Sequence, residues 1–258
     1  MIVKQAENVL DLLEYFGRIQ RVASLSEISA DLGWPRSSTF NLISTLVKRG
    51  YLYEPKPRGG FYPTPRWLVL AREITTANPL PESAINLMED LAQTSGETVW
   101  LAAPNGQQAV FLAVLQSAHP VRYTADVGKQ VPIHLTASGQ AIMSQMSKPQ
   151  ITSILNKATF VRYGPGTPMS VQEVTKNMDV SLKRGWFCSA SSYSKDLGGV
   201  SVPLTINGSA YSVTVAGPLF RVEDQMDDTA EKIHAAIGRH FGANYIRDNL
   251  PNLHRLSD

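Results

Sequence analysis

Apolar positions recur at helical spacing near the start of the chain. The first such pattern joins apolar residues three or four positions apart: Val3, Ala6, Val9, Leu10, Leu13 and Phe16. This spacing predicts an amphipathic helix, which we expect to end at Gly17. A short helix is predicted next, from Ser26 to Leu32, with Ser24 or Ser26 as its N-cap and Gly33 as its end.

A third and longer helix is predicted to open at Pro35 and to close at Gly50. Helix, short helix, glycine turn and longer helix together form a helix-turn-helix pattern. The apolar side of the third helix comprises Thr39, Leu42, Ile43, Leu46 and Val47. Its opposite side carries small polar groups and cations: Ser37, Asn41, Ser44 and Lys48, with Arg36 at the start and Phe40 beside them. Such a surface suits a major groove, where Asn can pair with adenine and Arg with guanine.

Two short strands are predicted after this helix, at residues 51–54 and 61–63, around a basic turn rich in proline and glycine at 55–60. Lys56 and Arg58 would lie at the tip of this hairpin. In a winged helix such residues reach phosphate or a minor groove. An ordinary surface hairpin is the alternative interpretation. A further helix is predicted over 66–77, and the Asn78-Pro79-Leu80-Pro81 segment then marks a domain boundary.

Beyond residue 80 the pattern mixes strands and helices. Asn105-Gly106 separates apolar runs at 98–103 and 109–116, and Asn207-Gly208 separates runs at 200–206 and 211–216, so each pair predicts a β-hairpin. A third strand region is expected at Pro120–Ala125. The predicted helices are 82–94, 137–146, 149–156, 170–184, with a capping box at Ser170 and Glu173, and 222–241. We therefore expect an α+β fold in which helices pack beside an antiparallel sheet.

Composition and charge narrow the class of protein. A chain of 258 residues with 43% apolar and 18% charged residues is long enough for one or two folded domains. The net charge is only +2, but residues 34–66 hold six basic residues against one acidic residue, as expected for phosphate contact. Cys188 is the single cysteine, which excludes an intrachain disulfide. With neither a membrane-spanning apolar run nor a signal peptide, we expect a soluble cytoplasmic protein.

Short motifs occur in a consistent order along almost the whole chain. The N-terminal ones are residues 24–39 (Ser-Leu-Ser-Glu-Ile-Ser-Ala-Asp-Leu-Gly-Trp-Pro-Arg-Ser-Ser-Thr) and 46–52. The C-terminal ones are Ser95-Gly-Glu-Thr-Val99, residues 119–122, 127–134, Thr136-Ala-Ser-Gly139, Arg184-Gly-Trp186 and Ala216-Gly-Pro218. Each motif is weak alone, but together they resemble the IclR family of bacterial transcription regulators over about residues 4–245.

The resemblance implies a domain order: a winged helix-turn-helix at 1–65, a linker helix at 66–79, a GAF-like α+β effector-binding domain with a curved antiparallel sheet at 80–250, and a tail at 251–258. It implies binding to double-stranded operator DNA as a homodimer or as a dimer of dimers. A small organic acid or aromatic effector would alter that binding, with no cofactor, metal or catalytic site. The DNA-binding residues expected are Arg36, Ser37, Phe40, Asn41, Ser44, Lys48, Lys56 and Arg58.

The family resemblance also implies an effector pocket. Its expected residues are Tyr123, Leu135, Ala137, Ser138, Ser189, Leu197, Gly199, Thr214 and Ala216, with free N–H groups at the start of the 137 helix able to hold a carboxylate. The chain departs from the family at 188–193, where hydroxyls replace an acidic run. It also has Asn41 where the family typically has Arg, and Gln140 where it usually has Lys. We therefore expect an effector and an operator that differ from the family average.

Two other functional classes are alternatives to this interpretation. Ser192-Tyr-Ser-Lys195 matches the Ser-x-x-Lys motif of penicillin-recognising hydrolases, but the Lys-Thr-Gly and Ser-Asp-Asn elements of that mechanism are missing. A sensor or scaffold that no longer binds DNA is the third class, against which the basic segment argues. No pair of histidines is spaced as metal ligands on a helix, so no metal site is expected.

Overall fold

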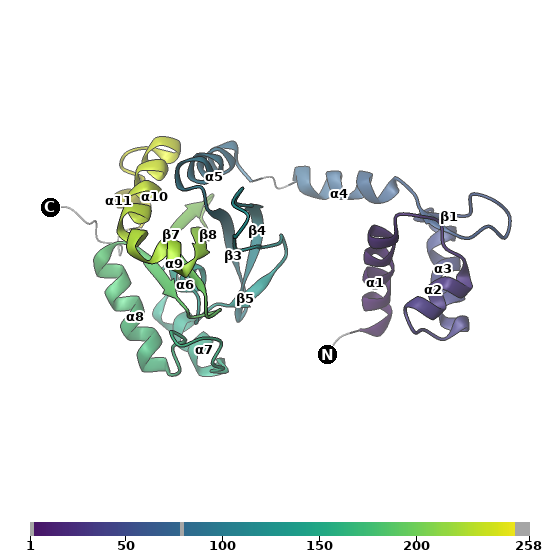
Figure 1. The fold of residues 1–258 in the computed structure, drawn as a ribbon, viewed down its shortest axis with the longest axis horizontal. Helices are drawn as coiled ribbons and strands as arrows, with labels where there is room; N and C mark the ends of the chain where they lie inside the picture. The colour runs from purple at the N-terminus through teal and green to yellow at the C-terminus, as the bar shows by residue number, and fades with distance from the viewer. Residues whose placement is uncertain (1–2, 78–79, 251–258) are drawn as a thin grey trace. The chain divides into compact units, whose positions relative to one another are not determined.

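The computed structural model describes residues 3–77 and 80–250, which fall into two compact units, 1–79 and 80–258 (Figure 1). Each unit has its own hydrophobic core. The predicted tail at 251–258 and the Asn78-Pro79 part of the predicted boundary lie outside the described residues.

The first unit is a winged helix-turn-helix. Its elements are α1 (Lys4–Ile19), α2 (Leu25–Asp31), α3 (Arg36–Lys48), β1 (Leu52–Tyr53), β2 (Tyr62–Pro63) and α4 (Arg66–Ala77). Ser24 and Glu27 form a capping box at the start of α2, which makes Ser24 rather than Ser26 the N-cap. Gly33 has a φ of +66°, a conformation that glycine adopts readily, in the turn that leads to α3. The chain thus enters α3 through a tight turn, as the sequence predicts.

Helix α1 differs from its prediction in length and in its buried face. It passes through Gly17 and ends at Ile19, where Gln20 adopts the left-handed conformation. Its buried residues are Leu12, Tyr15 and Phe16, whereas Val3 and Leu10 of the expected apolar stripe are exposed. The Tyr15 hydroxyl donates to Asp31 on α2, and burial together with this carboxylate raises the pKa of Tyr15 to about 12. This part-buried contact ties α1 to α2 through a face of α1 that apolar spacing alone does not identify.

The second unit is built on a curved, six-stranded antiparallel sheet with strand order β5-β4-β3-β8-β7-β6 (Figure 1). The strands are β3 (Thr98–Asn105), β4 (Gln108–Leu115), β5 (Gln130–Pro132), β6 (Phe187–Ala190), β7 (Leu197–Ile206) and β8 (Ser209–Pro218). Asn207 and Gly208 both have positive φ at the β7–β8 turn, as a two-residue hairpin requires.

Helices cover both faces of this sheet. They are α5 (Glu82–Ser95), α6 (Ala137–Met143), α7 (Lys148–Lys157), α8 (Val171–Arg184), α9 (Leu219–Val222), α10 (Met226–Phe241) and α11 (Tyr245–Asn249), with a 3-10 turn at Glu223–Gln225. Ser138 of α6 contacts Trp100 and Thr214, which are paired neighbours in the sheet and so share a face. Gly198 points the other way, toward Val222 and Met226. Helix α6 therefore packs on one face, and α9 and the start of α10 pack on the other.

Several predicted elements of this unit are wrong. Residues 120–125 form no strand, because side chains rather than a neighbouring strand bond their carbonyls: Thr98 donates to Tyr123 O and Arg221 donates to Val121 O. The edge strand is β5 instead. The predicted 222–241 helix is interrupted by the 3-10 turn, and α11 was not predicted. Only half of the predicted capping box forms, because Glu173 accepts from Met169 N rather than Ser170 N.

Candidate DNA interface and ligand cavity

Helix α3 has a buried face and a polar face on opposite sides. Thr39, Ile43 and Leu46 are buried in the core of the first unit. The side chains expected to contact DNA are all exposed: Arg36, Ser37, Phe40, Asn41, Ser44 and Lys48. Among the described residues, none of the polar members of this set makes a side-chain hydrogen bond. Val47 is also exposed, contrary to its predicted place on the apolar side.

Four of these residues form a continuous stripe. Ser37, Asn41, Ser44 and Lys48 are spaced by four, three and four residues, so their side chains lie along one face of the helix. The turn before α3 is held by the Ser29 hydroxyl, which donates to Trp34 O at 2.7 Å. The stripe therefore presents polar side chains that are free to bind a partner, on a helix whose preceding turn is held in place.

The predicted wing also forms. Lys56 and Arg58 are exposed at the β1–β2 turn, where Arg58 has a φ of +60° and its N–H donates to the Glu54 carboxylate at 2.6 Å. The base of the wing is joined to residue 23 by a bridge between Ala23 and Phe61. The backbone fit there is close, because a Cβ on Gly60 would lie 2.6 Å from Ala23 O.

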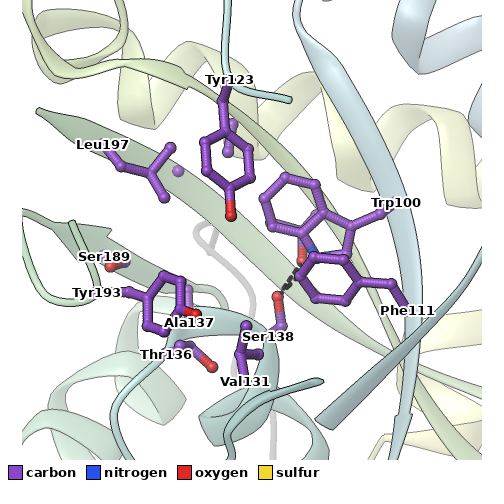
Figure 2. Close-up of a pocket in the computed structure, with 13 residues that line it drawn as sticks. Trp100, Phe111, Tyr123, Val131, Thr136, Ala137, Ser138, Ser189, Tyr193 and Leu197 are labelled. Atoms are coloured by element: carbon purple, nitrogen blue, oxygen red, sulfur yellow. Dashed lines mark hydrogen bonds between the residues drawn. The ribbon is translucent and has the colours of Figure 1, made fainter. Parts of the chain in front are cut away.

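The second unit encloses a cavity between α6 and the sheet (Figure 2). Its lining includes eight of the nine residues expected for the effector pocket: Tyr123, Ala137, Ser138, Ser189, Leu197, Gly199, Thr214 and Ala216. Leu135, the ninth, is buried but does not line the cavity. The structure adds five residues that the sequence did not suggest: Trp100, Phe111, Val131, Thr136 and Tyr193.

Aromatic side chains form much of the cavity wall. The Trp100 and Phe111 rings are stacked with their centroids 4.8 Å apart, and Tyr123 lies 5.7 Å from Trp100. Phe111 reaches this face because a bulge in β4 pairs Ala102 with Phe111 directly after Leu101 with Ala113. Figure 2 shows the Tyr123 hydroxyl directed between Leu197 and Trp100.

Four groups on this face form a hydrogen-bonded chain. Trp100 Nε1 donates to Ser138 Oγ at 3.0 Å, which lies 2.8 Å from Thr214 Oγ1. Thr214 donates to Ser201 Oγ at 2.9 Å, and Ser201 donates to Val213 O. Ser138, Thr214 and Ser201 are almost completely buried. These hydroxyls therefore satisfy one another inside an otherwise apolar core.

Helix α6 holds Ser138 in place through a close backbone contact. Thr136 caps the helix by accepting from Gly139 N. A Cβ on Gly139 would lie 2.0 Å from Ile133 O, so no larger residue fits without moving the helix. Gln140, at the position where the family usually has Lys, is buried and donates to His134 O. The Thr136-Ala-Ser-Gly139 motif thus fixes the cavity wall.

A lysine lies beside the aromatic wall. Lys129 Nζ donates to Tyr123 Oη at 3.0 Å and lies 5.0 Å from the Tyr123 ring centroid and 5.8 Å from that of Tyr193. Partial burial lowers the pKa of Lys129, but the hydrogen bond to Tyr123 and nearby groups outweigh it, so the pKa is raised. The ammonium group stays charged at neutral pH, next to two cavity residues.

The cavity is narrow in this structure. It leaves about 30 Å³ for the centres of water-sized spheres, which is room for a few waters at most. A much larger surface depression, about 620 Å³ by the same measure, adjoins it and shares Tyr123 and Leu197 with it. These two side chains therefore line both hollows, and the cavity must widen before an organic ligand fits in it.

The described residues give little support to a Ser-x-x-Lys hydrolase, a metal site or a membrane-spanning helix. Ser192 and Lys195 lie in an irregular segment rather than one helical turn apart, and the Ser192 hydroxyl donates to Gly166 O. In the part of the chain that the structure describes, no three His, Cys, Asp or Glu side chains gather to hold a metal ion. Within the same residues, no helix is long and apolar enough to cross a membrane.

Comparison with known proteins agrees with both units. The IclR helix-turn-helix domain matches residues 5–55, and the C-terminal domain of the bacterial transcriptional regulator IclR matches residues 73–239. The HTH-type transcriptional repressor AllR of Salmonella paratyphi A is 26% identical over 250 residues, covering 90% of this chain and 89% of that protein.

Solved structures show the same fold at low identity. The Thermotoga maritima IclR structure has a TM-score of 0.70 at 17% identity, covering 93% of this chain and 99% of that one. An IclR homolog from Microbacterium hydrocarbonoxydans, complexed with 4-hydroxybenzoate, has a TM-score of 0.70 at 21% identity over 93% and 99% of the two chains. A helix-turn-helix followed by this C-terminal domain defines a bacterial transcription regulator. The chain belongs to the IclR family, and no catalytic family is indicated.

Proposed function

We propose that this regulator binds operator DNA through α3 and the wing, and that a small organic effector in the α6 cavity alters that binding. The effector has an aromatic or other apolar body and carries a carboxylate. The observation that carries the effector part is the cavity itself, which is lined by buried hydroxyls and stacked aromatic rings.

The DNA-binding part rests on the exposed face of α3. The stripe of Ser37, Asn41, Ser44 and Lys48 has hydrogen-bonding groups free for base edges and phosphates. Arg36 lies at the start of the helix, Phe40 beside the stripe, and Lys56 and Arg58 at the wing tip. An exposed aromatic such as Phe40 can contact a thymine methyl group.

The effector part rests on the cavity and its edge. Leu197, Ala216 and the aromatic rings provide apolar contact, and Gly199 lets Ala216 pack close to it, because a Cβ on Gly199 would lie 2.6 Å from Ala216 Cβ. The charged Lys129 is a suitable partner for a carboxylate once Tyr123 moves. The 4-hydroxybenzoate bound by the Microbacterium homolog is an aromatic acid of this class.

A thermal-shift screen of small organic and aromatic acids tests the effector part. A ligand that binds only the folded protein raises the melting temperature by mass action. Ser138→Trp should abolish that shift, because the new side chain fills the cavity, while DNA binding stays measurable. Normal ligand binding to this variant by calorimetry would place the site elsewhere. Chemical conversion of the ligand by wild-type protein would contradict a regulator and indicate an enzyme.

A further inference from the structure

The hydroxyl chain on the cavity wall has only one possible direction. Trp100 Nε1–H can only donate a hydrogen bond, and Val213 O can only accept one. A serine or threonine hydroxyl carries a single proton. Since Ser201 gives its proton to Val213 O, Thr214 must donate to Ser201, and Ser138 must donate to Thr214.

This direction leaves the side-chain hydroxyls of Ser138 and Thr214 able only to accept further hydrogen bonds. The protons of Ser138 and Thr214 are both committed inside the protein, while each oxygen keeps one lone pair. Both residues line the cavity and are almost fully buried. A ligand atom facing them must therefore supply the hydrogen, because an acceptor there would meet two lone pairs without a proton between them.

Three other hydroxyl groups around the cavity have the reverse character. Among the described residues, the hydroxyl protons of Tyr123, Tyr193 and Ser189 have no acceptor, and Lys129 already donates toward Tyr123. Figure 2 places Tyr193 and Ser189 away from the Ser138–Trp100 contact. The Ser138 and Thr214 hydroxyls thus accept hydrogen bonds from a ligand, whereas the Tyr123, Tyr193 and Ser189 hydroxyls can donate them.

From this polarity the geometry points to an effector with an O–H or N–H donor at Ser138 and Thr214 and an anionic or carbonyl group at Tyr123 and Tyr193. The stacked Trp100 and Phe111 rings favour a flat body between the two ends. The ligand class is a hydroxy acid or amino acid analogue on a flat apolar body. This inference rests on the proposed function and adds the identity and orientation of the ligand's polar groups.

Matched ligand pairs test the inference by calorimetry on the full-length protein. The pairs are 4-hydroxybenzoate with 4-fluorobenzoate, 3-hydroxybenzoate with 3-fluorobenzoate, and lactate with pyruvate, where only the first member has the donor. We expect the donor member of any pair that binds to be about tenfold tighter, since its partner leaves a buried acceptor unpaired. Equal or tighter binding of the second member overturns the inference while the proposed function stands. If no member of any pair binds, the inference is overturned, whereas the proposed function fails only if the thermal-shift screen also finds no ligand.

A variant outside the cavity separates hydrogen-bond direction from shape. Ser201 is not part of the cavity lining, and Ser201→Ala removes the acceptor that takes the Thr214 proton. The Thr214 proton can then point to the ligand, so the non-donor member of each pair should bind more tightly. The two members should therefore bind about equally, in place of the tenfold preference for the donor member. Ser212→Ala is the matched control, because Ser212 Oγ is buried on the neighbouring strand without a hydrogen-bond partner. An unchanged preference in Ser201→Ala, or an equal change in Ser212→Ala, overturns the inference.

Discussion

Individual side chains on α3 should contribute to DNA binding in different ways. Asn41 can read a base edge, so Asn41→Ala should weaken operator binding about tenfold and leave the salt dependence unchanged. Lys48 can contact phosphate, so Lys48→Gln should weaken binding to DNA of any sequence by the same factor. It should also reduce the slope of log affinity against log salt concentration by about one. Fluorescence anisotropy with operator and random duplexes at several salt concentrations measures both effects. The assignment of Asn41 fails if its variant weakens both duplexes equally.

His134 should make stability depend on pH. Burial lowers the pKa of this imidazole, and a backbone contact with Thr159 offsets only part of that effect. In the unfolded chain the ordinary value is about 6.5, so below this pH the unfolded state binds a proton that the folded state does not. The contribution of His134 is therefore complete above about pH 6.5 and is lost as the pH falls.

Thermal melts of wild type and His134→Phe between pH 7.5 and 5.5 measure this dependence. Phenylalanine keeps a ring beside Phe160, whose centroid lies 5.1 Å from that of His134, but it cannot titrate. The melting temperature of the variant should fall less than that of wild type as the pH is lowered from 7.5 to 5.5. A parallel loss in both proteins would show that other groups cause the acid dependence.

Site residues differ in how visible they are in the sequence. Ser138 lies in a recognisable motif, whereas Trp100, Phe111 and Tyr193 look like ordinary core residues. They reach one cavity only through strand register, including the β4 bulge that sets Phe111 beside Trp100. Leu135 shows the opposite error: it neighbours the motif, but its side chain is buried outside the cavity. Sequence proximity identified the α6 wall, and only the fold identifies the aromatic wall.

At the scale of an element, α6 depends on a glycine that touches another backbone. Gly139→Ala would place a Cβ 2.0 Å from Ile133 O, so α6 must shift, and we expect a loss of at least about 1–3 kcal/mol together with loss of ligand binding. Gly238→Ala is a matched control in the interior of α10, where the new Cβ would lie 4.0 Å from Ala243 Cα. It should be neutral or stabilise by about 0.5–1 kcal/mol.

Denaturant unfolding of both variants tests this contrast. A Gly139→Ala protein as stable as wild type, with its ligand affinity intact, would show that α6 does not need this close approach. The two substitutions are chemically identical and both lie in helices, so helix propensity cannot account for a difference in sign between them.

Elements with strong local signals were predicted well, and those set by distant contacts were not. Asn207 and Gly208 both favour the positive φ that a two-residue turn needs, and the hairpin forms there. Residues 120–125 look like a strand, but distant side chains such as Thr98 and Arg221 bond their carbonyls instead. The three-residue strand β5 is too short for an alternating pattern to show. Helix α1 continues past Gly17, because glycine destabilises a helix but does not always end it.

At the scale of the whole molecule, we expect a dimer or a tetramer. Helix α4 has no buried residue, and Leu68, Val69 and Ile74 are each more than half exposed, as expected of a surface that another copy covers. Two linked winged helices also bind two half-sites far more tightly than one. Light scattering at micromolar concentration should therefore give at least twice the 28.3 kDa chain mass.

A pair of variants locates the surface that joins the copies. Leu68→Glu combined with Ile74→Glu should shift the protein toward monomer and weaken binding to a two-half-site operator. Val180→Glu, at an exposed position on α8, is the control and should leave the mass unchanged. A wild-type protein that remains a 28.3 kDa monomer contradicts the expectation of an oligomer.

The most direct test of the account is a titration of the duplex upstream of the protein's own gene with full-length protein, with and without a ligand found by thermal shift. We predict specific binding that weakens steeply as salt rises, and a change of at least fivefold in Kd at saturating ligand. Ser138→Trp should bind the same DNA without responding to the ligand. Specific binding that is absent or indifferent to salt, or a wild-type Kd unchanged by saturating ligand, would contradict the account.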